Sequence, residues 1–216
     1  MSPITVSANS IALSNSQPTP LSSNPVWLST AHGKSGSITI PVYYCNARSL
    51  KNKLFNLYSI LCCLIYHIIC FTESWLSFEF TNGLLDPKGL YNIFRFDRGN
   101  NQPYGGVCVF IRKSYSVCQL LCDEMYKDVE IVALKITLSK FSITLLCSYF
   151  SPGLSNPSFA NAVNCNKSFC KPDKSNYWVA VGDYNLPHID WHNTHFPTDF
   201  KSQTFPLTYM IMVFLS

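Results

Sequence analysis

The sequence predicts a single domain that combines β-strands with an amphipathic helix. At 216 residues, of which 47% are hydrophobic, the chain is long enough to bury one core and little more. Several short apolar runs have the length and alternation of strands, whereas one segment changes to helical spacing. The formal net charge of +4 is compatible with a polyanionic partner but too small to require one.

The cysteine content indicates a reducing compartment. Ten cysteines would suggest disulfides in a secreted chain, but the N-terminus lacks the basic start and continuous apolar core of a signal peptide. We therefore expect an intracellular protein, nuclear or cytoplasmic, in which most thiols pack as small apolar groups. No stretch reaches the roughly 18–20 apolar residues that cross a bilayer, so no membrane partner is expected.

The first part of the chain changes character twice. Residues 1–36 are rich in Ser, Pro, Thr and Asn without a sustained period, which predicts a disordered leader. From Ser37, SITIPVYYCN alternates apolar residues and predicts a strand that ends at Asn46. From Ser49 onward, the spacing predicts an amphipathic helix of about four turns with Ser49 as its N-cap. The apolar face of this helix would carry Leu50, Leu54, Leu57, Leu61 and Leu64.

The following segments alternate between strands and turns. IICF at 68–71 predicts a strand that delivers Glu73 at its end, and Asn82-Gly83 and Asp86-Pro87 predict a loop. Residues 91–111 predict a β-hairpin around the turn at 100–106. Residues 129–137 and 141–150 predict two further strands, and residues 156–170 a short helix.

The segment YWVAVGDYNLPHIDW, at 177–191, is the centre of the functional interpretation. Trp178 to Val181 predict a buried strand, and Gly182 allows a turn or a close approach to a ligand. In an extended chain the side chains of Asp183 and Asn185 project on the same side. The carboxylate could accept a proton from water, and the amide could donate to a developing oxyanion. An Asx-rich turn that closes a strand would explain the same string.

Polar residues also follow three other predicted strands. Asn46, Glu73 and Tyr149 occupy such ends, as do Asp183 and Asn185. Taken singly, each has an ordinary explanation as a turn residue, an exposed acid or an edge aromatic. As a set they offer hard oxygen ligands for Mg²⁺, a base, an amide donor and a phenol. That combination suits metal-assisted phosphodiester hydrolysis.

The motifs at these positions resemble those of a known family. They are YCNARSL at 44–50, IICFTESWL at 68–76, RFDRG at 95–99, GGVCVFIR at 105–112, CSYFSPG at 147–153 and VGDYNLPHIDW at 181–191. Their order along the chain is similar to that of the endonuclease/exonuclease/phosphatase superfamily. Their residues resemble the motifs of the endonuclease domain of LINE-type non-LTR retrotransposons. The resemblance extends from about residue 37 to 191.

The resemblance implies an α/β fold, a four-layer αββα sandwich of two mixed sheets (DNase-like), and a monomeric enzyme that nicks DNA with Mg²⁺ or Mn²⁺. Asn46 and Glu73 would hold or orient the metal, and Tyr149 would contact the scissile phosphate. Asp183 would align or deprotonate the attacking water, while Asn185 would steady the transition state. Arg98 is a looser match that would contact the DNA backbone or form a surface salt bridge.

The sequence also departs from the family pattern. It contains no Ser-Asp-His motif, and His188, His192 and His195 follow Asn185 too closely to replace it. The resemblance therefore implies a C-terminally truncated copy: an incomplete domain at 37–191, a divergent tail at 192–216, and a second sheet that lacks its last strands and has an exposed edge.

Other interpretations remain open. A catalytically inert remnant could keep residual DNA binding, and a phosphatase of the same superfamily would share the metal and the base. A zinc-stabilised binding module could use Cys165, Cys170, His188 and His192, although the gap between the two pairs exceeds the usual finger spacing and contains an apolar strand.

Overall fold

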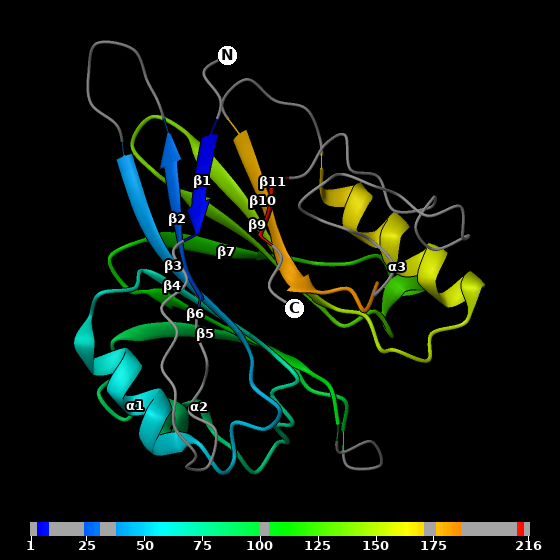
Figure 1. The fold of residues 1–216 in the computed structure, drawn as a ribbon, viewed down its shortest axis with the longest axis horizontal. Coiled ribbons are helices and arrows are strands. Elements are labelled where there is room, and N and C mark those ends of the chain that lie inside the picture. The colour runs from blue at the N-terminus through cyan, green and yellow to red at the C-terminus, as the bar shows by residue number, and fades with distance from the viewer. Residues whose placement is uncertain are drawn as a thin grey trace.

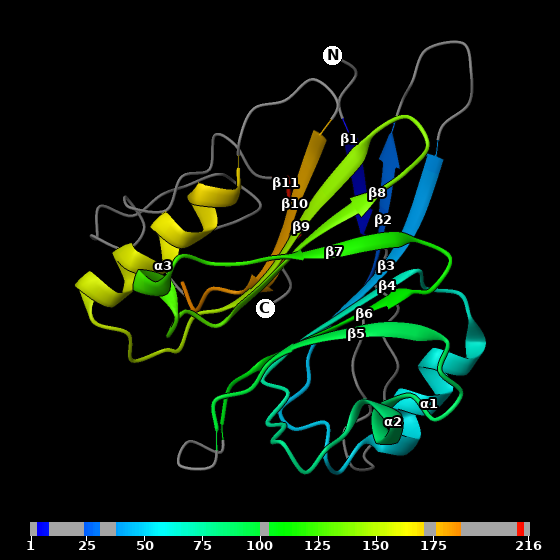
Figure 2. The same ribbon diagram turned by 180° about the vertical axis from the view of Figure 1, so that it is seen from behind.

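Two β-sheets stack face to face, with helices on their outer surfaces (Figures 1 and 2). The computed structural model describes residues 4–8, 24–30, 38–99, 104–170, 176–186 and 211–213, and the statements below concern these residues. Helices α1 (Leu54–Cys63) and α2 (Asn82–Leu85) cover the first sheet, and α3 (Asn156–Phe169) covers the second (Figure 1). The predicted four-layer αββα sandwich is confirmed.

The first sheet contains six strands in the order β1-β2-β3-β4-β6-β5. Their bounds are β1 Ile4–Ala8, β2 Asn24–Thr30, β3 Ile38–Asn46, β4 Ile68–Thr72, β5 Tyr91–Phe96 and β6 Val107–Arg112. Strands β3 and β4 are parallel and joined through α1, so Asn46 pairs with Thr72 at a shared C-terminal end. The other neighbours in this sheet are antiparallel, including the predicted β5-β6 hairpin.

The second sheet contains five strands in the order β11-β10-β9-β8-β7. Their bounds are β7 Ser116–Leu120, β8 Ile131–Thr137, β9 Ser142–Tyr149, β10 Asn176–Asp183 and β11 Ile211–Val213. Strands β9 and β10 are parallel and joined through α3, and their register pairs Asp183 with Tyr149. Each sheet thus contributes one parallel pair whose C-terminal ends carry polar residues.

The main core lies between the two sheets and consists largely of β-branched and sulfur-containing side chains. The first sheet contributes Val42, Cys70 and Val109, and the second contributes Val132 and Cys147, all fully buried. The burial of Cys70 and Cys147 agrees with the prediction that most thiols pack as small apolar groups. Smaller clusters lie under the helices, with α1 placing Leu57 and Leu61 on the first sheet. No helix in the described part of the chain is long and apolar enough to cross a membrane.

The predicted helix starts later than expected. We expected Ser49 to cap it, but α1 begins at Leu54 with Lys53 at its N-cap. The Ser49 N–H donates to the Glu73 carbonyl at 2.9 Å, and the Leu50 N–H donates to the Ser74 carbonyl at 3.0 Å. Arg48 and Ser49 have φ of +41° and +80°, and these left-handed conformations are incompatible with an N-cap at Ser49.

Further differences concern segments predicted to lack regular structure. Residues 1–36 were expected to be disordered, yet β1 and β2 lie within them and extend the first sheet beyond β3. The loop expected at 82–87 contains α2, whose first turn is capped by the Thr81 hydroxyl accepting from the Leu84 N–H. The second sheet was expected to have an exposed edge, but β11, from the tail at 192–216, pairs with β10 over three residues.

Candidate active site

The fold brings the polar strand ends of both sheets to one place. Asn46 ends β3, Glu73 follows β4, Tyr149 ends β9 and Asp183 ends β10. The side-chain amide nitrogen of Asn46 donates to Glu73 Oε1 and to Asp183 Oδ2, both at 2.9 Å. Since Asn46 and Glu73 belong to the first sheet and Asp183 to the second, this amide bridges the two layers.

The orientation of the Asn46 amide is fixed by a backbone group. Its Oδ1 accepts a hydrogen bond from the Arg48 N–H at 3.2 Å, so its nitrogen faces the carboxylates. An amide N–H₂ group that satisfies two carboxylates at once holds them at a short, defined separation. In this conformation Asn46 orients the acidic groups.

The surroundings of Asp183 change its proton affinity. Burial raises its pKa, and the negative charge of Glu73 adds to the increase. Hydrogen bonds from the Asn185 backbone N–H, 3.1 Å from Oδ1, and from Asn46 partly offset this effect. A carboxylate with a raised pKa is a better proton acceptor than an ordinary aspartate. Asp183 therefore has the properties that the predicted base requires.

Tyr149 lies beside these acids with little exposure to solvent. Its side chain is buried, and burial together with the charges of Glu73 and Asp183 raises its pKa. The phenol is therefore protonated at neutral pH and available as a hydrogen-bond donor. A cavity of about 220 Å³ opens next to it, lined by residues that include Ser151, Ser158 and Asn161.

Asn185 contacts the strand ends through its side chain. Its Nδ2 donates to the Phe150 carbonyl at 2.7 Å, while the Phe150 N–H donates to the Asp183 carbonyl at 2.8 Å. These bonds join the ends of β9 and β10, so one amide proton of Asn185 stabilises the turn. The second amide proton has no such contact among the described residues, and the oxyanion role of Asn185 stays a prediction.

Glu130 is a buried acid beside the site that the sequence analysis did not single out. It is 6% exposed, forms an ion pair with Arg98 and accepts the Gly106 N–H at 2.6 Å. Arg98 also donates to the Ser151 hydroxyl, and its guanidinium carbon lies 5.8 Å from the centre of the Tyr149 ring. Of the two roles predicted for Arg98, the structure shows a partly buried ion pair; DNA contact stays a prediction.

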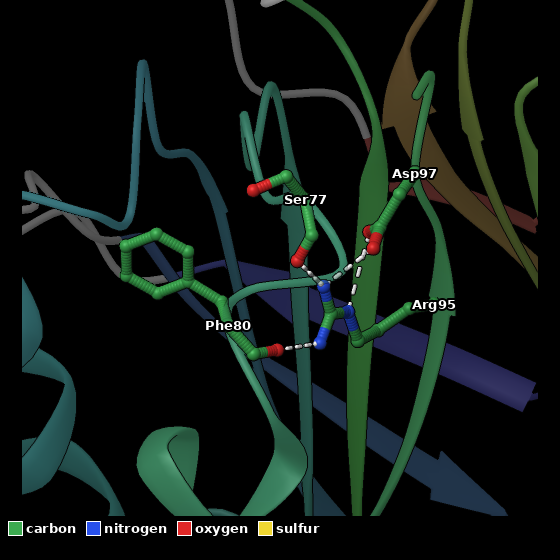
Figure 3. A network of polar contacts seen from close by, with 4 residues as sticks. All are labelled: Ser77, Phe80, Arg95 and Asp97. Carbon is green, nitrogen blue, oxygen red and sulfur yellow. Dashed lines mark hydrogen bonds and ion pairs between the residues drawn. The ribbon is translucent and has the colours of Figure 1, made fainter. Parts of the chain in front are cut away.

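The second missed residue is Arg95, which holds the loop after Glu73 (Figure 3). Its guanidinium donates to the backbone carbonyl of Ser77 at 3.0 Å, to that of Phe80, and to both carboxylate oxygens of Asp97. Ser77 and Phe80 belong to the segment that leads away from Glu73, so Arg95 fastens that segment to β5. The only sequence signal was its place in the RFDRG motif.

The donor set fits a hard divalent cation through the carboxylates. Glu73 and Asp183 lie on either side of the Asn46 amide, and carboxylate oxygens are the ligands that Mg²⁺ prefers. The Asn46 oxygen would become a ligand only if its amide reversed and gave up the Arg48 N–H. The described residues contain no group of three or more His, Cys, Asp or Glu side chains that could hold a metal.

The zinc alternative is only partly covered by the structure, because His188 and His192 lie outside the described residues. Of its two cysteines, Cys165 has its thiol against Cys122, and Cys170 donates to the Asn166 carbonyl.

Solved structures of other proteins have the same arrangement of sheets and helices. The endonuclease domain of TRAS1, a telomere-specific non-LTR retrotransposon, matches with a TM-score of 0.50 and 16% identity over 67% of this chain and 59% of that one. An AP endonuclease from Archaeoglobus fulgidus matches with a TM-score of 0.55 and 13% identity over 77% of this chain and 68% of that one. The chain has the endonuclease/exonuclease/phosphatase fold.

A humanized D. rerio TDP2 shares this fold, with a TM-score of 0.52 and 18% identity over 71% of this chain and 69% of that one. The chain spans less than two thirds of the length of the TRAS1 domain. No protein-family model and no curated protein matches the sequence.

Proposed function

We propose that the chain hydrolyses phosphodiester bonds in DNA with Mg²⁺, as a nicking endonuclease similar to those of LINE-type retrotransposons. The observation that carries this proposal is the Asn46 amide, which holds the carboxylates of Glu73 and Asp183 together next to Tyr149. Support also comes from proteins that share the fold: TRAS1 provides a retrotransposon endonuclease domain, and the 3' phosphatase NExo from Neisseria, with a TM-score of 0.51, is bound to a product DNA hairpin.

Each residue has a role that follows from its surroundings. Asp183, with its raised pKa, accepts the proton of the attacking water. Tyr149, kept protonated by burial and neighbouring charge, donates to a phosphate oxygen. Glu73 would provide carboxylate oxygens to the cation, and Asn46 fixes the distance between the two acids. Bound Mg²⁺ would supply neutralisation of the charge on the phosphate.

One donor to the phosphate that the family motif provides has no counterpart in this sequence, which bears on the rate of the reaction. The sequence contains no Ser-Asp-His motif, which in the resembling family provides a histidine at the scissile phosphate. Loss of one such donor lowers a rate by about 10²–10³-fold. We therefore expect slow turnover, and DNA binding without turnover is the alternative that the assay must separate.

A plasmid-nicking assay tests the proposal. Supercoiled DNA incubated with the protein and Mg²⁺ should relax, and excess chelator should stop the reaction. Glu73→Ala and Asp183→Ala should abolish nicking, whereas Glu79→Ala, which removes an exposed carboxylate on the same loop, should not. Undiminished nicking by Asp183→Ala would show that the activity does not come from this site.

Two further readouts distinguish the alternatives. Retention of labelled DNA by wild type without nicking would favour an inert binding remnant. Release of inorganic phosphate from a 3'-phosphorylated oligonucleotide, without cleavage of the intact strand, would favour a phosphatase.

A further inference from the structure

A pair of thiols lies on the outer side of the second sheet, away from the carboxylates. The sulfur atoms of Cys122 and Cys165 are 3.5 Å apart, and 43 residues separate them in the sequence. Cys122 follows β7 and is half-buried, whereas Cys165 is fully buried on α3. Both belong to the apolar cluster that α3 forms with the second sheet.

The pKa values of the two thiols are shifted in opposite directions. The hydrogen bond between the two sulfur atoms lowers the pKa of Cys122, while burial and the carboxylate of Asp123 oppose the change. The same hydrogen bond and burial raise the pKa of Cys165. A thiolate is the nucleophilic form of cysteine. Cys122 is therefore the sulfur that attacks, and Cys165 is the one that reacts second.

Access to solvent supports the same order. Cys122 lies between two exposed apolar side chains, Leu121 at 85% and Met125 at 70% exposure. Cys122 itself is partly exposed and so open to a small oxidant, whereas Cys165 has no exposed surface. An accessible sulfur in contact with a buried partner is the arrangement of an attacking and a resolving cysteine.

We infer that Cys122 and Cys165 form a reversible thiol-oxidation site that closes to an intramolecular disulfide with small disulfide oxidants such as oxidised glutathione. The Cys122 thiolate attacks one sulfur of glutathione disulfide and releases a glutathione thiolate. Cys165 then loses its proton, attacks the Cys122 sulfur and releases the second glutathione. The protein loses two electrons and two protons, and one glutathione disulfide becomes two glutathione molecules.

The structural change that this reaction needs is small and local. The sulfur atoms must approach from 3.5 Å to a bond length of about 2.05 Å, by a shift of the loop before η1 (Glu124–Tyr126) toward α3. Both segments line the cavity beside Tyr149, η1 through Met125 and α3 through Ala162. The bond would therefore join two segments of the wall of that cavity.

Oxidation of the reduced full-length chain by glutathione disulfide tests the inference. Peptide mapping without reductant, with fragment spectra, should show Cys122 linked to Cys165 within one molecule, with neither of these two left as a free thiol. Dithiothreitol should restore both. A stable glutathione adduct on Cys122, or a bond from Cys122 to any cysteine other than Cys165, would overturn it.

Thermal unfolding provides a second readout. A disulfide that closes a loop of this length should raise Tm on the order of 10 °C in the oxidised protein. The rise should be absent in Cys122→Ser and present in Cys118→Ser, which removes an exposed cysteine of the neighbouring strand. Cys165→Ser alters a fully buried position and could prevent folding. The test therefore relies on the wild-type peptide map and on the comparison of Cys122→Ser with Cys118→Ser. An equal Tm for oxidised and reduced wild type would contradict the inference.

Discussion

Replacing Arg95 with methionine should destabilise the protein far more than an ordinary loss of a surface ion pair. The substitution keeps the aliphatic part of the side chain but removes every guanidinium contact to Ser77, Phe80 and Asp97. The Arg95 and Asp97 side chains are 13% and 23% exposed, so solvent would only partly compensate the carboxylate and the two carbonyls. Hydrogen bonds from charged donors contribute about 1.5–3 kcal/mol each and are not additive. We expect a loss of about 3 kcal/mol in the free energy of unfolding.

Urea unfolding of Arg95→Met and of a matched control measures this effect. The control, Lys127→Met, removes an ion pair with Glu124. The Lys127 and Glu124 side chains are 64% and 88% exposed, and ion pairs this exposed contribute at most about 1 kcal/mol. In thermal scans Arg95→Met should lower Tm by roughly 6–12 °C. If the free energies of unfolding of Arg95→Met and Lys127→Met differ by less than 0.5 kcal/mol, the hydrogen bonds of Arg95 do not stabilise the loop after Glu73.

Three further predictions concern the site and the core. Gly106→Ala should lower the free energy of unfolding by about 1–3 kcal/mol, because Gly106 has φ +84° and an added Cβ would lie 2.8 Å from the Ser74 hydroxyl. The control Gly153→Ala has open space around the added Cβ and should change the free energy of unfolding in urea by less than 0.5 kcal/mol. Asp183→Asn should raise the free energy of unfolding at pH 7, because the raised pKa of Asp183 means that its ionisation destabilises the folded state as pH rises. The gain over wild type should vanish below about pH 3.9, where the carboxyl is protonated in both the folded and the unfolded chain. Urea unfolding curves at several pH values would check this. Leu57→Ala should lower the free energy of unfolding by about 2–5 kcal/mol, while Phe55→Ala on the exposed face of α1 should leave it nearly unchanged in the same assay.

The strands were predictable because their signal is local. Apolar alternation located β3, and continuous apolar runs located β4, β6 and β10. The start of α1 was not predictable, since Ser49 has the chemistry of an N-cap but has φ +80°, which is not the backbone conformation of an N-cap. Likewise β7 was missed, because its exposed and half-buried residues show no clear alternation and its pairing with β8 decides its conformation.

The sequence predicted which residues form the candidate site but not the hydrogen bonds among them. The positions of Asn46, Glu73, Tyr149 and Asp183 at strand ends follow from the sequence, because apolar runs stop at each of them. Which atom of Asn46 faces the acids depends on the Arg48 N–H, a contact that no periodicity reveals. Glu130 escaped notice because its partners, Arg98 and Gly106, lie 32 and 24 residues away in the connection between β5 and β6.

Backbone conformation gives an independent reason to place function at this edge of the sandwich. Among the described residues other than glycine, positive φ occurs at Arg48, Ser49, Leu64, Glu73, Trp75 and Asn185. All except Leu64, which ends α1, belong to the loops that carry Asn46, Glu73 and Asp183. Such conformations cost on the order of 1–3 kcal/mol each and persist only where surrounding contacts enforce them. The cross-bonds from Ser49 to Glu73, from Arg95 to the loop after Glu73, and from Asn185 to Phe150 are contacts of that kind, so the fold maintains strained loops where the carboxylates meet.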